Sequence, residues 1–302
     1  MNFNKQHGTA LISALILITI IVSVTTAWIS QTHFHVRKQQ IINEKLQASW
    51  LADGAKILSV TALKKTSFNQ TTPLIARFNN IPAPKKWRIT AELTDAQAFF
   101  NLNSVTEEYM RLTYYSLLKL VVNEATINDI YYATIAWIAP NLIKQRTREF
   151  QDRYATLKQP YLPGGQKMQS LAEFKLVWGV TNKIAKKLDP YITVLPESTP
   201  ININTCPAIL IKSLTPNLKD SDVNKIIFAR GDKGFKTDSE LFAVLKELNI
   251  PVQNITTTSQ YFWLRVIVTA PSQRKFFSKY LIYRPISPKN VKQVIVLQQY
   301  IS

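Results

Sequence analysis

The chain has 302 residues and a formal charge of +18, from 37 lysines and arginines against 19 aspartates and glutamates. Its length suggests about two domains, and its apolar content of 46% suits a packed globular chain rather than a disordered one. The three histidines, His7, His33 and His35, all lie near the amino terminus, and Cys206 is the single cysteine. The rest of the chain therefore lacks the side chains for a Ser-His-Asp triad, a zinc helix or a Cys/His metal cluster.

The amino-terminal segment predicts a membrane-spanning helix. No charged residue occurs from Gly8 to Thr32, and residues 9–29 are rich in Leu, Ile and Val. As a helix this core is about 30 Å long, which matches the hydrocarbon thickness of a bilayer. Trp28 follows at its end, where aromatic side chains favour the bilayer surface.

A secretory signal peptide is the alternative interpretation of this segment, with Thr25 and Ala27 as the cleavage site before Trp28. However, the helical pattern continues beyond that site, because residues 9–66 contain no proline and only one glycine, Gly54. Apolar residues recur three and four positions apart at Leu51, Ala55, Leu58 and Ala62. We therefore predict one helix of about 85 Å, half in lipid and half packed on a soluble domain.

The segments after the helix predict a small β-unit. Residues 67–86 read as a polar connector that contains three prolines. Residues 87–93 alternate apolar and polar side chains, which predicts a half-buried strand. A turn at Thr94 and Asp95 then makes residues 96–103 the second strand of a candidate hairpin.

A helical block follows. Ser104 and Glu107 form a capping box for a helix to Val122, and Thr126 caps a helix that Pro140 ends. After a loop to about residue 168, further helices are predicted behind the capping box of Ser170 and Glu173, up to Leu188, near Pro207, and at 222–230 and 239–248. Three β-branched and aromatic runs, at 261–268, 276–283 and 292–300, predict a closing β-meander.

A short basic leader ending in Gly8, followed by a long apolar helix, resembles the type IV pilin-like proteins. In that family a prepilin peptidase cuts after this glycine and methylates the new amino terminus. The resemblance therefore implies cleavage between Gly8 and Thr9, with Thr9 methylated. Phe or Met is usual after the cut, so Thr9 departs from the family pattern.

The fifth residue after the cut is Ser13, where most pilin-like subunits have a glutamate. That carboxylate is costly in a bilayer unless it finds a partner, which in pili is the amino terminus of the neighbouring subunit. A subunit without the carboxylate cannot pair with a neighbour above it, and it needs no such pairing if it starts the fibre. Ser13 is otherwise an ordinary membrane residue. The missing glutamate is regular in K-type minor pseudopilins of type II secretion systems.

Motifs similar to those of the K-type family recur in order along nearly the whole chain. They are Asp95-Ala96-Gln97, Asn101-Leu102-Asn103, Leu188-Asp189-Pro190-Tyr191-Ile192, Leu195-Pro196, Ile201-Asn202-Ile203-Asn204-Thr205 and Ser259-Gln260-Tyr261-Phe262. The acidic W-I-D-x-D segment of the family is replaced by residues 137–141, and Glu149 and Asp152 alone make a poor oxygen cage for calcium. We therefore expect no metal site and no cofactor.

The resemblance implies an α+β chain with a type IV pilin-like fold, in which a long amino-terminal transmembrane helix packs on an antiparallel sheet with a large inserted all-α domain. The implied segments are a prepilin leader at 1–8, a transmembrane helix at 9–29, the periplasmic half of that helix at 30–66, a β-domain at 67–103 plus 259–302, and an inserted helical domain at 104–258 with a helix-hairpin-helix or SAM-like part at about 200–250.

The function implied by the resemblance is that of a minor pseudopilin without catalytic activity, in the inner membrane of a Gram-negative bacterium with its soluble domain in the periplasm. Such a subunit initiates the pseudopilus and caps its tip during export of folded proteins across the outer membrane. Its implied partners are I- and J-type minor pseudopilins, the major pseudopilin, the prepilin peptidase and the inner-membrane assembly platform.

Three other functions are compatible with parts of the sequence. The charge of +18 and the helix-hairpin-helix pattern would suit a membrane-anchored DNA-binding protein, but the hairpin at 214–218 has no glycine and Pro216 removes a donor, so we do not expect nucleic acid as a partner. A minor pilin of a type IV pilus is the second. An anchored enzyme is the third, although no phosphate loop, paired-cysteine motif or nucleophile elbow occurs. We expect Cys206 to be a small buried residue.

Overall fold

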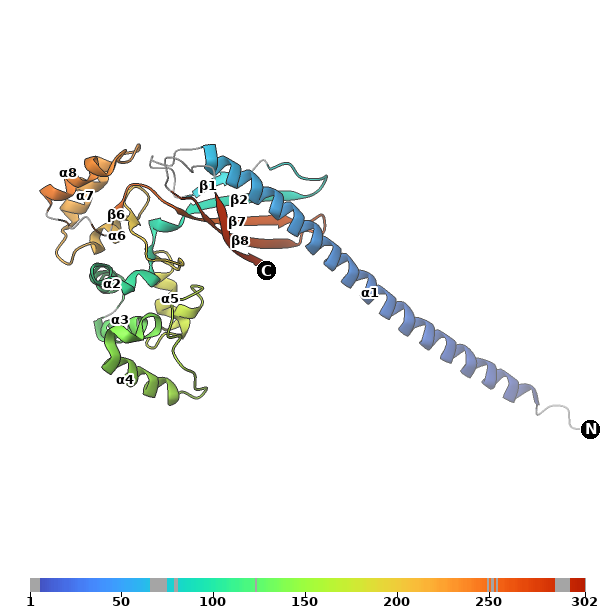
Figure 1. Cartoon of the computed structure of the whole chain (residues 1–302). Coiled ribbons are helices and arrows are strands. Elements are labelled where there is room, and N and C mark those ends of the chain that lie inside the picture. The colour runs from blue at the N-terminus through green and yellow to red at the C-terminus, as the bar shows by residue number, and fades with distance from the viewer. Residues whose placement is uncertain are drawn as a thin grey trace, which may run out of the picture.

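The computed structural model describes residues 6–65, 75–78, 81–122, 124–248, 250, 253, 255–285 and 294–301. Figure 1 shows three parts in a row. A long helix reaches away from the molecule at the amino terminus, a sheet packs along its other half, and a helical block lies beyond the sheet.

Helix α1 (Gln6–Lys65) has 60 residues, so it is about 90 Å long, and the predicted single long helix is confirmed. Only its carboxyl-terminal part touches the sheet. The residues that it buries there are Ala48, Ala52, Ala55 and Leu63, spaced so that they share one helix face. The sequence predicted that Leu58 shares the buried face with Ala55, but the Leu58 side chain is half exposed. The buried face therefore lies slightly round the helix from the predicted one.

The sheet has five antiparallel strands in the order β1-β2-β7-β8-β9. They are β1 (Ile75–Phe78), β2 (Arg88–Asp95), β7 (Tyr261–Thr269), β8 (Lys275–Tyr283) and β9 (Ile295–Ile301). The closing meander is therefore confirmed. Alternate residues of the inner strands, such as Leu93, Leu264 and Tyr280, face α1 and form one core with it.

Two predictions for the β-unit were wrong. The segment read as a connector contains β1, a four-residue edge strand too short to show a period of two. The hairpin after β2 does not form, because the Asp95 side chain accepts the Gln97 N–H and turns the chain into a 3-10 helix at Ala96–Ala98. The next strand, β3 (Phe100–Asn101), pairs in parallel with β4 (Ile192–Thr193) instead.

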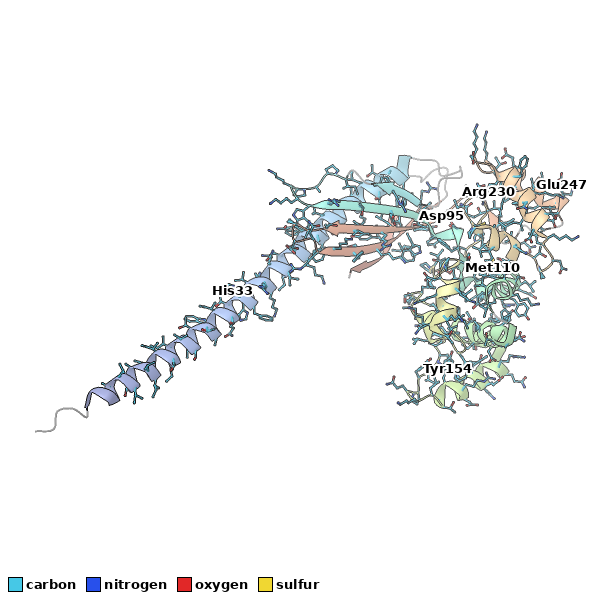
Figure 2. All side chains as sticks on the ribbon, turned by 180° about the vertical axis from the view of Figure 1, so that it is seen from behind. His33, Asp95, Met110, Tyr154, Arg230 and Glu247 are labelled. Atoms are coloured by element: carbon cyan, nitrogen blue, oxygen red, sulfur yellow. The ribbon has the colours of Figure 1, made fainter. Side chains whose placement is uncertain are left out.

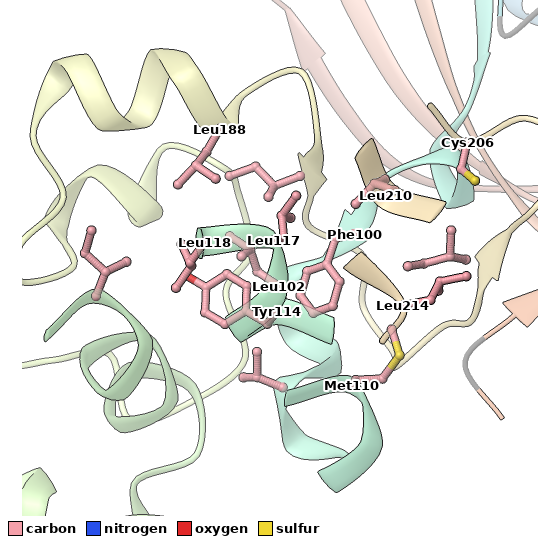
Figure 3. Packing of buried hydrophobic residues seen from close by; sticks show 14 of the residues in the cluster. Phe100, Leu102, Met110, Tyr114, Leu117, Leu118, Leu188, Cys206, Leu210 and Leu214 are labelled. Atoms are coloured by element: carbon pink, nitrogen blue, oxygen red, sulfur yellow. The ribbon is translucent and has the colours of Figure 1, made fainter. Parts of the chain in front are cut away.

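The helical block has its own hydrophobic core. Its helices are α2 (Glu108–Val121), α3 (Ile127–Ile138), α4 (Lys144–Ala155), α5 (Asn182–Leu188), α6 (Ala208–Ser213), α7 (Asp220–Arg230) and α8 (Asp238–Glu247), with β5 (Ile201–Asn202) and β6 (Ile255–Thr256) paired in parallel. Figure 3 shows Phe100 and Tyr114 in this core, where their ring centroids lie 5.3 Å apart in a stacked arrangement.

Three details of the block differ from the sequence predictions. Helix α2 begins at Glu108 and Glu107 makes no side-chain cap, because Ser104 is turned away to exchange hydrogen bonds with the Thr199 backbone. Glu173 does accept the Ser170 N–H, but only one 3-10 turn follows. The segment predicted as a loop to residue 168 contains α4. Its sequence is mostly charged, so the few apolar positions of its buried face gave no clear helical pattern.

Candidate assembly sites on the anchor helix and at the domain junction

The amino-terminal half of α1 is exposed on every side. Residues 10–43 contact no other element closely enough to be buried, and apolar side chains such as Leu11, Val24 and Trp28 remain more than half exposed. Within the described part of the chain, α1 is the one helix long and apolar enough to cross a membrane, by length and composition. A helix that is apolar all round needs lipid or protein around it.

The predicted processing and assembly residues lie at the free end of this helix. Gly8 and Thr9 are in the first turns of α1 and Ser13 follows one turn later, all remote from the sheet (Figure 1). Hydroxyl groups further along the helix need no water as a hydrogen-bond partner, because each donates to a backbone carbonyl of the preceding turn. Ser23 donates to the Thr19 carbonyl and Thr26 to the Val22 carbonyl, both at 2.7 Å.

An ion pair between buried Glu44 and exposed Arg274 fixes the point where α1 meets the sheet. Glu44 accepts from the Arg274 guanidinium at 2.9 Å and from the Ser272 hydroxyl at 2.7 Å, both in the turn between β7 and β8. Burial alone raises the pKa of the Glu44 carboxyl, but these donors, Gln40 and the charge of Arg274 hold it below its usual value. The turn is thus held against the helix.

A second buried carboxylate joins the sheet to the helical block. Asp95, at the end of β2, accepts from Thr205 at 2.5 Å, Ser259 at 2.7 Å and Asn202 at 2.9 Å. It also accepts the Gln97 N–H at 2.8 Å. Burial raises the pKa of the Asp95 carboxyl, and the four donors oppose that rise. Figure 2 shows Asp95 where the strands give way to the helical block.

Three asparagine side chains extend this network by bonding to backbone groups that no ladder satisfies. Asn101 accepts from the Leu195 N–H at 3.0 Å and donates to the Glu197 carbonyl at 2.7 Å. Asn103 bridges both backbone groups of Met168, at 2.8 and 2.9 Å. Asn204 does the same for Phe235, at 2.8 and 2.9 Å. All three asparagines are buried.

These residues are the polar members of the motifs singled out in the sequence. Gln97 completes the set, because its side-chain oxygen accepts the Gln260 N–H at 2.6 Å. Asp95 and Gln97 fix how the sheet and the helical block sit together, because Asp95 accepts from Asn202 and Thr205 and Gln97 donates to the Pro200 carbonyl. The bonds of Asn101, Asn103 and Asn204 hold segments of the block to one another. Sequence reading identified the motifs but missed these roles.

The described residues hold little that could support catalysis or metal binding. They contain no group of three His, Cys, Asp or Glu side chains that could hold a metal ion. Cys206 is buried, and burial raises the pKa of its thiol to about 12. The thiolate, which is the reactive form, is therefore disfavoured. Helices α6 and α7 occupy the region predicted as helix-hairpin-helix, and Arg230 at the end of α7 donates to the carbonyls of Ile203 and Cys206 ahead of α6.

Comparison with known proteins agrees with this architecture. Sequence models of the family described as Type II secretion system (T2SS), protein K, match residues 98–197 and 201–258, together more than half of the chain. Relatives called Type II secretion system protein K include one from Pectobacterium carotovorum, 25% identical over 67% of both chains, and one from Klebsiella pneumoniae, 23% identical over 87% of this chain and 85% of the relative.

A solved structure shares the fold. It is the GspK-GspI-GspJ complex from the Type 2 Secretion System of enterotoxigenic Escherichia coli, with a TM-score of 0.71 at 21% identity, covering 88% of this chain and 99% of the matched one. The predicted pilin-like α+β fold with a helical insert is therefore confirmed, and the similarities do not favour a DNA-binding protein or a pilus pilin. The chain belongs to the type II secretion system protein K family, and its role is that of a minor pseudopilin.

Proposed function

We propose that this minor pseudopilin starts the pseudopilus and remains at its tip, anchored beforehand in the inner membrane with its sheet and helical block in the periplasm. Its role is structural, with no catalytic step. The block supports this placement best. It joins the sheet through Asp95 at the end farthest from the free half of α1, where Arg284 bonds to the Leu63 carbonyl near the end of that helix (Figure 1).

A steric argument connects that position to the tip. Pilin-like subunits stack along their helices, so the next subunit in a shaft would have to pass the helical block. At the tip no subunit follows, and the block meets no neighbour. Ser13 also supports the tip placement, because a terminal subunit does not need the glutamate that pairs with a neighbour.

We also propose I- and J-type minor pseudopilins as direct partners. The support is the shared fold with a chain solved in a GspK-GspI-GspJ complex. The free half of α1 suits such partners, because packing of several apolar helices would cover its exposed residues inside a fibre. The major pseudopilin, the prepilin peptidase and the assembly platform are the further expected partners.

Labelling of assembled fibres tests the tip placement. The chain, with an epitope on the exposed surface of α8, replaces protein K in a type II-secreting bacterium that overproduces the major pseudopilin. Gold-labelled antibody is expected at one end of each fibre. The same epitope on the major pseudopilin, as the control, decorates the whole shaft. Label from this chain spread along the shaft would contradict the proposal.

Processing at Gly8 is tested separately by mass spectrometry of the amino terminus. The wild-type chain is expected to begin at a methylated Thr9, whereas Gly8→Leu leaves an uncleaved precursor. Gly54→Ala serves as the matched control, because an added Cβ at Gly54 meets nothing within 4 Å. A Gly8→Leu chain that still begins at Thr9 would show that Gly8 is not the recognition residue.

A further inference from the structure

Basic residues concentrate at the end of the sheet nearest the amino terminus. Three segments meet there: residues 30–47 of α1, the residues 81–88 before and at the start of β2, and the 270–275 turn into β8. They carry eight exposed cations, which we call the basic collar: Arg37, Lys38, Lys45, Lys85, Lys86, Arg88, Arg274 and Lys275. Glu44 is the only carboxylate in these segments, and it is buried.

The collar differs from the basic residues of the helical block. There, acidic residues lie among the cations, and some of them form ion pairs, as Asp220 does with Lys212 at 2.6 Å and Asp129 with Arg153 at 3.2 Å. Among the collar residues, only Arg274 forms an ion pair with a residue that the structure describes, and that residue is Glu44. The other seven charges are left to attract external anions.

The length of α1 sets the height of the collar above the membrane. The uncharged stretch from Thr9 to Val36 has 28 residues, which as a helix is about 42 Å long. A bilayer with its headgroups is about 40–45 Å thick. Arg37 and Lys38 therefore come at the level of the outer phosphates. Glu44, which holds the 270–275 turn, is seven residues further, about 10 Å higher.

That height is close to the distance over which charges act in salt, about 8 to 10 Å. Long lysine and arginine side chains on the 81–88 and 270–275 loops shorten the gap further. These loops lie on one side of α1, so a helix tilt of the usual size, about 20°, lowers them towards the surface. The clamp from Glu44 to Arg274 and Ser272 fixes the turn to the helix. The loops therefore follow the tilt of α1.

We propose that the basic collar binds anionic lipid headgroups of the membrane in which α1 is anchored. In the single subunit before assembly, this contact tilts α1 towards its sheet and sets the orientation of the helical block. The ligand is the phosphate of an anionic lipid, because the charges line the one end of the soluble part that faces the bilayer. The inference needs the membrane anchor but not the position at the fibre tip.

The test uses the full chain in lipid nanodiscs with a fluorophore on Ala83→Cys, an exposed position among the collar residues. The native Cys206 is only 2% exposed and stays unlabelled. Quenching by nitroxide-labelled headgroups reports how close the loop lies to the bilayer. We expect strong quenching in discs with phosphatidylglycerol, weak quenching in zwitterionic discs, and loss of the difference near 1 M salt, where the screening length is about 3 Å.

Two charge variants decide the outcome. Each collar cation near an anionic surface strengthens association about fivefold, so Lys85→Gln, Lys86→Gln, Arg88→Gln and Lys275→Gln together should reduce quenching to the zwitterionic level. The matched control removes the same charge from the helical block, at Lys183, Lys187, Lys233 and Lys246, all exposed, and should leave quenching unchanged. Equal quenching in both kinds of disc, or equal loss in both variants, would overturn the proposal.

Discussion

The Asp95 junction gives a prediction whose size follows from the structure. Asp95→Ala leaves four donors in a buried place without their acceptor: the hydroxyls of Thr205 and Ser259, the Asn202 amide and the Gln97 N–H. A buried donor without a partner costs about 1–3 kcal/mol. The mutation also removes the cost of burying the carboxylate, which is the cause of its raised pKa.

The balance of these effects is a loss of about 3–5 kcal/mol in the free energy of unfolding. Asp95→Asn should lose less, about 1–2 kcal/mol, because its amide oxygen still accepts and the two hydroxyls can turn to accept from its nitrogen. Asp152→Ala, which removes an exposed carboxylate from α4, should change the free energy by no more than about 0.5 kcal/mol.

The assay is denaturant unfolding of the full chain in detergent micelles, followed by tryptophan fluorescence. The pH dependence adds a second measurement. Because the pKa of Asp95 is raised, its contribution to stability is greatest at low pH and declines as pH rises from the ordinary aspartate value, 3.8, through the raised value. Asp95→Asn lacks this decline. If Asp95→Ala unfolds like Asp152→Ala, the junction does not depend on this carboxylate and the reasoning fails.

Two further outcomes follow from buried groups elsewhere. Glu44→Gln should destabilise the contact between α1 and the sheet by about 1 kcal/mol at neutral pH. The difference from wild type should shrink as pH falls below about 4.5, because the lowered pKa of Glu44 makes the ion pair stabilising only above that range. Unfolding curves at several pH values check this, and a difference independent of pH would contradict it. Cys206 should react with maleimide on the order of 1000-fold more slowly in the folded chain than in urea, because burial raises the pKa of its thiol to about 12. Equal reaction rates would show that the thiol is accessible in the folded chain.

Local pattern was sufficient wherever an element is long or its composition is distinctive. The run without proline from Thr9 to Thr66 predicted α1, and three aromatic and β-branched runs predicted the meander of β7, β8 and β9. Short or charged elements were missed for the opposite reason. Strand β1 has four residues, and α4 shows few apolar positions because it buries only Thr147, Phe150 and Tyr154.

The sequence by itself determined the membrane-length apolar helix, the order of β and helical segments, and the family motifs, because each of these is written in neighbouring residues. Only the tertiary structure decided which face of α1 meets the sheet and what the motifs do. Asp95, Asn202 and Ser259 become partners across 107 and 164 residues of chain. Local periodicity carries no information about such pairs, since a buried polar side chain is satisfied by whatever group the fold brings to it.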